Sequence, residues 1–190
     1  KFALVGAVLL APLGYAVASY VDTKNAPIAF AQKERAGVVI VTPASKLLAA
    51  LVEQRTHIVR AAAGDAQARA ALPAARAAVA EAVAATDAAS AQVGAGLALD
   101  KQWADLKALV DGLPADAAAT GPAAAQGLYD AWTKATTATT GLIVQASNTS
   151  NLILDPDLDS FYVMNAAIIN LPALVDGFGQ VAALETIAAA

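Results

Sequence analysis

An uncharged apolar run, Phe2 to Val21 (FALVGAVLLAPLGYAVASYV), stands near the N-terminal end of the chain. At a helical rise of about 1.5 Å per residue, the run measures roughly 30 Å, which is the thickness of the hydrocarbon core of a bilayer. The sequence therefore predicts a transmembrane helix over residues 1–21 and a separate extramembrane domain over residues 22–190. Lys1 ahead of the run favours a cytoplasmic start, which places Asp22 and the following residues outside the cytoplasm.

A secretory signal peptide is the rival interpretation of this run, because Ala16-Val17-Ala18 could serve as a small-residue cleavage site. However, the run is longer than the roughly 7–15 apolar residues of a signal-peptide core, and helical patterning resumes directly after it. Pro12 and Gly14 are compatible with a span, because neighbouring helices can satisfy the backbone groups that they free. We therefore expect a retained span.

The composition argues against several classes of function. Hydrophobic residues make up 58% of the chain, partly because alanine is abundant, and alanine favours helix while adding little to a core. A net charge of −4 with scattered basic residues does not suit nucleic-acid binding. The chain has no cysteine, and its single histidine, His57, cannot form a metal cluster alone. We therefore expect no enzyme within this chain, no cofactor and no metal site.

The remaining sequence predicts four long helical segments and no strand, because period-two alternation is absent and turn signals are far apart. Gly64-Asp65 separates the first two segments, residues 112–122 separate the second from the third, and Asp155-Pro156 begins the fourth. Helices of about 50 to 70 Å joined by short turns fold back on one another. The expected fold is all-α: a transmembrane helix that continues into an elongated antiparallel bundle of the four-helix type, truncated at its C-terminus.

Apolar residues at alternating spacings of three and four predict the face that each helix buries. In the first segment these residues are Leu47, Leu48, Leu51, Val52, Ile58 and Val59, and in the second Leu99, Trp103, Leu106, Val110 and Leu113. In the third they are Leu128, Trp132, Ala135, Thr139, Leu142, Ala146 and Ile153, and in the fourth Phe161, Met164, Ile168, Leu171, Val175, Phe178 and Ala182. Pro43 and Pro172 lie inside the first and fourth segments, where each is expected to kink or interrupt its helix.

Arg55 is a charged residue inside an apolar stripe, four residues after Leu51 and three before Ile58. A charge at this position must reach solvent, find an internal partner, or meet an anionic ligand in the bundle core. We favour an internal ion pair or a side chain that reaches solvent. The alternative is a ligand site to which Arg35 and Arg60 contribute at other heights along the bundle.

Asp155, Asp157 and Asp159 form a D-x-D-x-D run that resembles the start of a calcium-binding loop. Such a loop needs Gly at the next position and Glu at the twelfth, where this chain has Ser160 and Ala166. We favour a structural role, in which Asp155 caps the fourth helix and the other acids lie in its first turns, where the helix dipole favours negative charge. A ligand or cation contact is the alternative.

Residues 147–165 (SNTSNLILDPDLDSFYVMN) resemble a stretch common in the extracytoplasmic sensor regions of bacterial methyl-accepting chemotaxis proteins, which typically reads S-N-L-x-L-D-P-D-L-D-S-Y-Y-L-M-D. Residues 34–37 (ERAG) resemble the E-R-x-G of that family's first periplasmic helix, and Leu171-Pro172 with Gly179-Gln180 resembles its fourth segment. The apolar run is similar to its first transmembrane helix. The resemblance covers essentially the whole chain. The departures are Phe161 for Tyr, Asn165 for Asp, and Gln54-Arg55 where His-Arg is frequent.

The resemblance implies a signal-sensing region of a chemoreceptor that is homodimeric in the bacterial inner membrane. Such a region relays the binding of a small molecule or a periplasmic protein as a helix displacement. The candidate ligand contacts are Arg35, Arg55, Arg60, Tyr162 and Asn165, although Asn165 lacks the charge that would suit a cationic ligand. A second span, a HAMP linker and a signalling rod would follow Ala190.

Two other interpretations of the sequence stay open. The same kind of region occurs ahead of histidine kinases and diguanylate cyclases, so an enzymatic output could lie beyond Ala190. A secreted or anchored structural helical protein is the other alternative.

Overall fold

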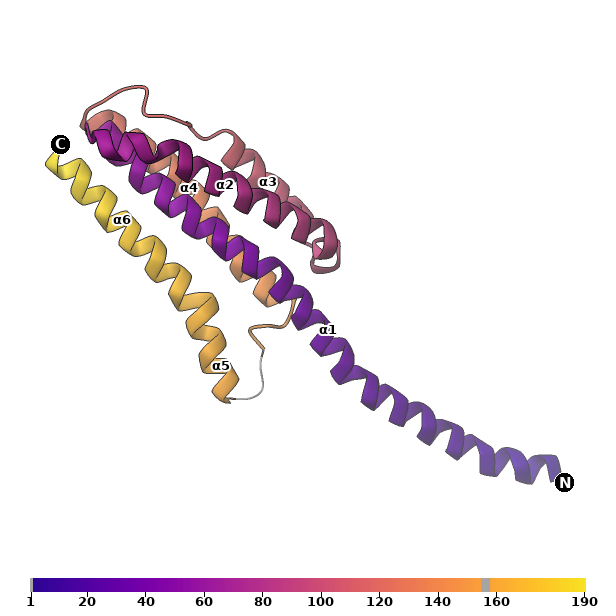
Figure 1. Ribbon diagram of the computed structural model, residues 1–190. Helices are drawn as coiled ribbons and strands as arrows, with labels where there is room; N and C mark the ends of the chain where they lie inside the picture. The colour runs from indigo at the N-terminus through magenta and orange to yellow at the C-terminus, as the bar shows by residue number, and fades with distance from the viewer. Residues whose placement is uncertain (1, 155–157) are drawn as a thin grey trace.

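The computed structural model describes residues 2–154 and 158–190, and every regular element in those ranges is helical. This confirms the predicted all-α class. The elements in chain order are α1 (Phe2–Ala62), α2 (Ala66–Val93), η1 (Ala95–Leu97), α3 (Asp100–Asp111), α4 (Pro122–Thr149), α5 (Leu158–Met164), η2 (Asn165–Asn170) and α6 (Leu171–Ala189). Figure 1 shows an elongated body of helices lying side by side, from which the N-terminal part of α1 projects.

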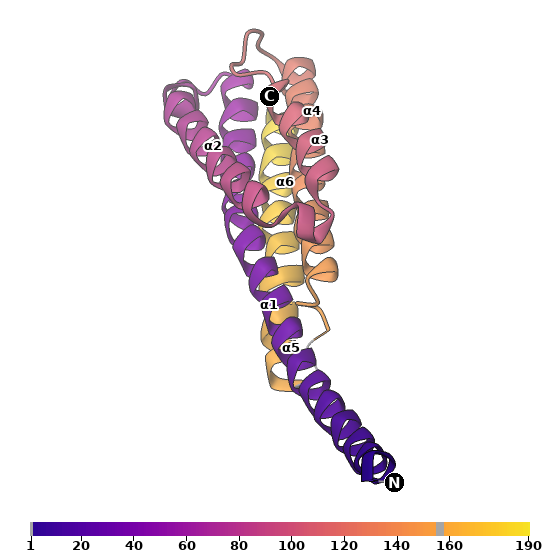
Figure 2. The same ribbon diagram turned by 90° about the vertical axis from the view of Figure 1, so that its right-hand side faces the viewer.

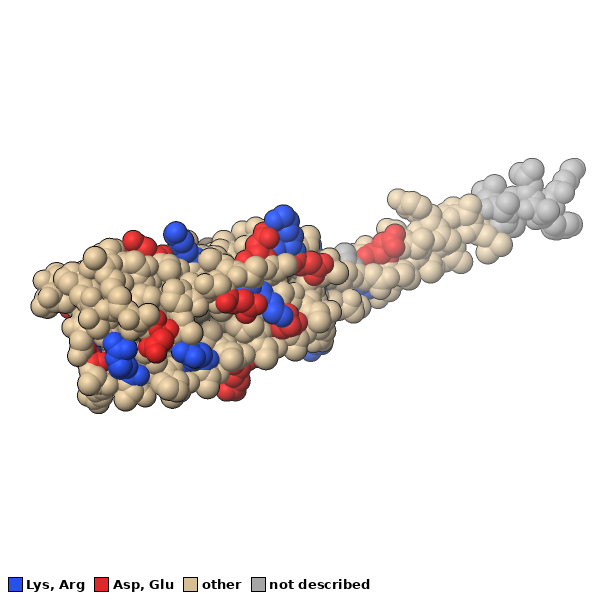
Figure 3. Space-filling view, turned by 90° about the horizontal axis from the view of Figure 1, so that it is seen from above, with Lys and Arg blue, Asp and Glu red and all other residues tan. Residues whose placement is uncertain are grey.

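α1 is a single helix of 61 residues that connects the projecting part to the body. It is not interrupted at Pro43, where a kink or a break was expected. From Leu10 to Asn25 its side chains are exposed, whereas the apolar stripe predicted from Leu47 to Val59 is buried. In Figure 3 the projecting part is largely uncharged, and charges of both signs are interspersed over the body. The two halves of α1 thus have different surroundings.

Two stretches of helix, Leu10–Ala62 and Phe161–Ala189, are long and apolar enough to cross a membrane by length and composition. The most apolar window of the first is 44% buried within the protein and that of the second 17%. Buried core helices of soluble proteins satisfy the same criterion. The structure therefore contains segments suited to a bilayer, and the assignment of residues 1–21 to a span stays a prediction.

α2 begins directly after Gly64-Asp65, the predicted boundary between the first two segments. Asp65 is its N-cap, and the carboxylate accepts hydrogen bonds from the backbone N–H groups of Gln67 and Ala68, both at 2.9 Å. Gly64 before it has a φ of 102°, which L side chains rarely adopt. The hydrogen bond from Ala68 and then the adjacent Arg60 guanidinium hold the pKa of Asp65 below its ordinary value.

The second predicted segment is not one helix, which corrects the expectation of four. The chain leaves α2 at Gly94, passes through η1, and folds back into α3, which packs on α2 and α4. A Cβ at Gly94 would lie 2.6 Å from both Asp100 Oδ1 and Ser90 O, so this turn needs a glycine. Leu97 and Leu99 are buried in the turn, and their burial compensates for the interrupted backbone hydrogen bonding.

The core lies where α1 packs against α2 on one side and against α4 and α6 on the other. Figure 2 shows α6 alongside α1 and α4, with its C-terminal end at the end of the body remote from the N-terminus. The apolar positions predicted for the first three segments are all buried or partly buried. Because α1 contacts three neighbouring helices, a change at any of these interfaces acts on α1.

The fourth segment is interrupted near Pro172, as predicted: α5 leads into η2, a π-helical turn, and α6 begins just before the proline. Its predicted seam is wrong from Leu171 onward, whereas Phe161, Met164 and Ile168 are partly buried. Pro172, Asp176 and Ala183 are the buried residues of α6, whereas Phe178 is 74% exposed and Leu171 57%. α6 turns its small and polar face toward α1 because Asp176 pairs there with Arg55, as described below.

Candidate functional site

Arg55 lies where α1, α4 and α6 meet, and its side chain is fully buried. Nη1 donates to the hydroxyls of Thr133 and Thr136 at 3.2 and 3.1 Å, and Nη2 donates to the backbone carbonyl of Asp176 at 3.1 Å. The Asp176 carboxylate completes the set, with Oδ1 2.9 Å from Nη1. One guanidinium therefore ties three helices together, and the favoured interpretation of an internal ion pair is confirmed.

Residues of α4 and α6 surround this ion pair. Gln180 Nε2 donates to Asp176 Oδ2 at 2.8 Å, and the Tyr129 hydroxyl donates to Gln180 Oε1 at 3.3 Å. The Tyr129 ring also faces the guanidinium, with its centroid 5.8 Å from Arg55 Cζ, a cation–π arrangement. A Cβ at Gly179 would overlap Val52 on α1, so α6 can approach this closely only at a glycine.

The other predicted basic residues do not join Arg55. Arg35 precedes it by 20 residues on the same helix, which is about 30 Å at helical rise, and Arg35 is exposed. Arg60 is also exposed, and its Nη2 lies 2.5 Å from Asp65 Oδ2. The three arginines therefore do not form one cluster. All the hydrogen bonds of Arg55 are with the protein itself, so an anionic ligand for Arg55 stays a prediction.

Tyr162 and Asn165 lie in α5 and η2, away from the ion pair along the same helical segment. Tyr162 is 62% exposed and packs edge-on against Phe161, with ring centroids 5.9 Å apart. Asn165 is the first residue of η2. Asp159 lies in α5, whereas Asp155 and Asp157 fall outside the described residues. No group of three or more metal-ligating side chains occurs within residues 2–154 and 158–190.

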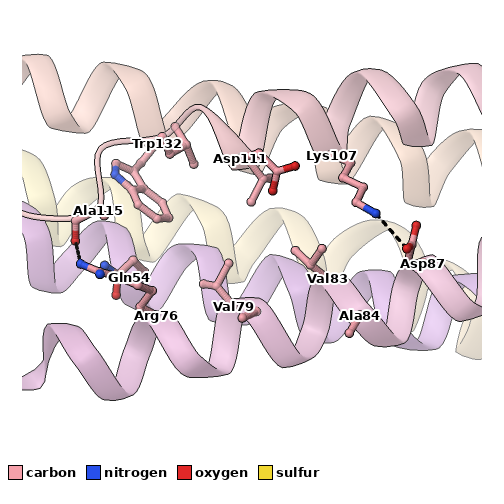
Figure 4. A pocket seen from close by; sticks show the side chains of 13 residues that line it. Gln54, Arg76, Val79, Val83, Ala84, Asp87, Lys107, Asp111, Ala115 and Trp132 are labelled. Atoms are coloured by element: carbon pink, nitrogen blue, oxygen red, sulfur yellow. Dashed lines mark hydrogen bonds and ion pairs between the residues drawn. The ribbon is translucent and has the colours of Figure 1, made fainter.

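Gln54 and Trp132 lie at the same cavity, and neither of them was predicted from the sequence as a site residue. Both line a cavity of about 450 Å³ between α2 and α3, to which α1 contributes Gln54 and α4 contributes Trp132 (Figure 4). Gln54 follows Leu51 by three residues and precedes Ile58 by four, which is core spacing for a polar side chain. That spacing was the available signal for Gln54. Trp132 was predicted only as a packing residue.

A charged cluster closes the opposite end of this cavity. Asp87 on α2 accepts from Lys107 Nζ on α3 and from Trp103 Nε1, both at 2.8 Å. These hydrogen bonds, that of Lys107 first, hold the pKa of Asp87 below its ordinary value, and the same contact raises the pKa of Lys107. The cluster links α3 to α2 at this end of the cavity.

Comparisons with protein-family models, curated proteins and solved structures found no match to this chain. The assignment of function below therefore rests on the sequence patterns and on the geometry of the helices.

Proposed function

We propose that this chain is the extracytoplasmic signal-sensing region of a bacterial transmembrane chemoreceptor. Residues 1–21 would span the inner membrane, and residues 22–190 would form an elongated antiparallel helical bundle that dimerises. The observation that carries the proposal is the continuity of α1, a single helix from the apolar run to the buried Arg55. A continuous helix of this kind would carry a displacement in the body toward the membrane, although Pro27 and Pro43 lie within it.

The mechanism follows from the contacts of α1. Arg55 fastens α1 to α4 and α6 through hydrogen bonds and one ion pair, so these helices have a preferred relative position. A ligand or partner that binds a different relative position better would shift the population toward it. Packed helices respond by small rigid displacements of about 1–2 Å rather than by continuous deformation. α1 would carry such a displacement to the bilayer.

Labelling of introduced cysteines tests the topology, because the chain has none of its own. In intact cells, a membrane-impermeant maleimide is expected to label Ala91→Cys, which is exposed on α2, and to leave Leu13→Cys unlabelled. Labelling of Ala91→Cys only after lysis would contradict an extracytoplasmic domain. Recovery of the protein in the soluble fraction, with its N-terminus just after Ala18, would contradict the span.

The swimming behaviour of cells carrying the complete protein tests the signalling role. Arg55→Leu is expected to shift the basal tumbling frequency, because it releases α1 from α4 and α6. Lys46→Leu is the matched control, since Lys46 is an exposed basic residue on the same helix. An unchanged tumbling frequency in Arg55→Leu, at an unchanged protein level, would contradict the proposed relay.

A further inference from the structure

The cavity between α2 and α3 has the size and composition of a small-molecule site. Its volume of about 450 Å³ falls within the range of roughly 300–1,000 Å³ typical of ligand pockets. Val79 and Val83 on α2 and Val110 and Leu113 on the other wall give it an apolar middle. Figure 4 shows Gln54, Trp132 and Arg76 toward one end and the Asp87–Lys107 pair at the other.

Three buried polar atoms at one end of the cavity have no hydrogen-bond partner within the described residues. They are Nε2 and Oε1 of Gln54 and Nε1 of Trp132. Gln54 is fully buried and Trp132 is 4% exposed. An unsatisfied buried polar group costs about 1–3 kcal/mol, so a side chain as polar as Gln54 is unfavourable there unless something binds it. These atoms provide two donors and one acceptor for an occupant.

The basic and acidic side chains that line the cavity are equal in number, and one ion pair forms among them. Arg76 donates to the backbone carbonyl of Ala115, and Lys107 pairs with Asp87. Two basic and two acidic side chains line the cavity, since Asp111 is the remaining acid. Arg76 has no acidic partner among the described residues, so charge balance alone does not select the occupant, and the preference for a carboxamide-like edge rests on Gln54 and Trp132.

We propose that this cavity binds a small uncharged molecule with an apolar body and a carboxamide-like edge. Its carbonyl oxygen would accept hydrogen bonds from Trp132 Nε1 and Gln54 Nε2, and its N–H would donate to Gln54 Oε1. The apolar body would lie along Val79, Val83 and Val110. This site deepens the proposed sensing function and rests on it for its physiological meaning, whereas binding itself is measured without any signalling readout.

Calorimetric titration of the detergent-solubilised 190-residue chain tests the site with three probes of one size class. The probes are 3-phenylpropanamide, its N,N-dimethyl derivative, which lacks the donor, and 3-phenylpropanoate, which is anionic. The primary amide is expected to bind at least about tenfold more tightly than the other two, since an unpaired polar group in a buried site costs roughly 1–3 kcal/mol. Equal binding of the three probes, or no binding of the primary amide, overturns the proposal.

Two variants locate the binding site. Gln54→Leu and Trp132→Phe are each expected to weaken binding of the primary amide at least about tenfold, whereas Gln145→Leu, on an exposed position of α4, leaves it unchanged. Gln54→Leu is also expected to keep or raise the melting temperature, because it removes an unsatisfied buried amide. Trp132→Phe keeps an aromatic ring in place, so it provides a second test should Gln54→Leu misfold.

The outcomes separate this site from the proposed function. Unchanged affinity in both variants overturns the site and leaves internal water as the partner of Gln54 and Trp132. If binding of the primary amide depends on Gln54 but labelling places residue 91 inside the cell, the ligand site is supported and the extracytoplasmic sensor is contradicted.

Discussion

Gly177 and Gly179 lie two residues apart on α6, and alanine substitution at the two positions should change the free energy of unfolding in opposite directions. Both are helical glycines, and replacing a helical glycine by alanine in open space stabilises a protein by about 1 kcal/mol. A Cβ at Gly177 would have no heavy atom within 4 Å. Gly177→Ala is therefore expected to raise the free energy of unfolding by about that amount.

At Gly179 the same change meets α1. The new Cβ would overlap Val52 Cγ1 and lie 2.9 Å from Arg55 Nη2. Val52 is β-branched and has one strongly preferred rotamer in a helix, while Arg55 is held by its hydrogen bonds and by Asp176. Overpacking of this kind costs about 1–3 kcal/mol. After the helix-propensity gain of about 1 kcal/mol, Gly179→Ala should lower the free energy of unfolding by about 0–2 kcal/mol.

Thermal and guanidinium unfolding of the 190-residue chain in mild detergent, followed by circular dichroism, measures this difference. The two variants should differ by about 1–3 kcal/mol, which corresponds to roughly 2–12 °C in melting temperature for a chain of this size. Adding Val52→Ala should remove most of the penalty at Gly179, giving a favourable coupling energy. Equal stabilisation by Gly177→Ala and Gly179→Ala would refute the packing of α6 on α1 at this point.

Arg55→Leu is expected to lower the free energy of unfolding by about 3–5 kcal/mol, because it leaves the buried Asp176 carboxylate without a counter-charge and with only its hydrogen bond from Gln180. Denaturant titration of Arg55→Leu, Asp176→Leu and the double variant should show that the two losses are not additive. Because the pKa of Asp87 is lowered in the folded state, its contribution to stability is present above its ordinary pKa and is lost as pH falls through the lowered value. Asp87→Asn should therefore flatten the pH dependence of the free energy of unfolding in the acid range. If that free energy falls with decreasing pH equally steeply in Asp87→Asn and in the parent chain, the prediction is wrong. Gly121 has a φ of 105°, so Gly121→Ala should cost about 1–3 kcal/mol, whereas Gly127→Ala, at an open helical position, should not destabilise. Equal melting temperatures for Gly121→Ala and Gly127→Ala would contradict the expected strain at Gly121.

The helices that carry large apolar residues were predictable from the sequence. Leu51 and Ile58 on α1, and Trp132 and Leu142 on α4, repeat at helical spacing and are all buried. Their periodicity identifies the buried face because burying large apolar side chains dominates the energetics there. The same spacing placed Arg55 within the apolar stripe, but it could not identify the partners of Arg55, which come from α4 and α6.

The break between α2 and α3 was not predictable in the same way. Residues 66–93 are so rich in alanine that several faces of the helix are equally suited to packing, and high helix propensity continues up to the turn. The decisive contacts are tertiary, since Leu97 and Leu99 are buried by the folded-back chain. This turn brings α3 back along α2, and the cavity lies between those two helices, so the proposed ligand site was beyond the reach of sequence reasoning for the same reason.

The rotation of α6 was predicted wrongly because apolar spacing was weighed without the charge on α1. At 100° per residue, Asp176 and Phe178 are 200° apart around the helix, so both cannot face α1. A buried Arg55 without a counter-charge costs several kcal/mol, more than the roughly 1.5–3 kcal/mol gained by burying one large apolar side chain. The ion pair therefore determines the rotation, and Phe178 lies on the exposed side.

α6 is therefore expected to rotate about its own axis when the ion pair is removed. In a double variant carrying Arg55→Leu and Asp176→Leu, apolar burial alone would decide the rotation, and Phe178 should move toward α1. A cysteine introduced as Leu174→Cys, one helical turn before Phe178 and at a position that is 54% exposed, should then react more slowly with a soluble maleimide than the same cysteine in the parent chain, with circular dichroism confirming that helicity is retained. An unchanged reaction rate would show that the close approach of Gly179 to Val52, rather than the ion pair, determines how α6 is rotated.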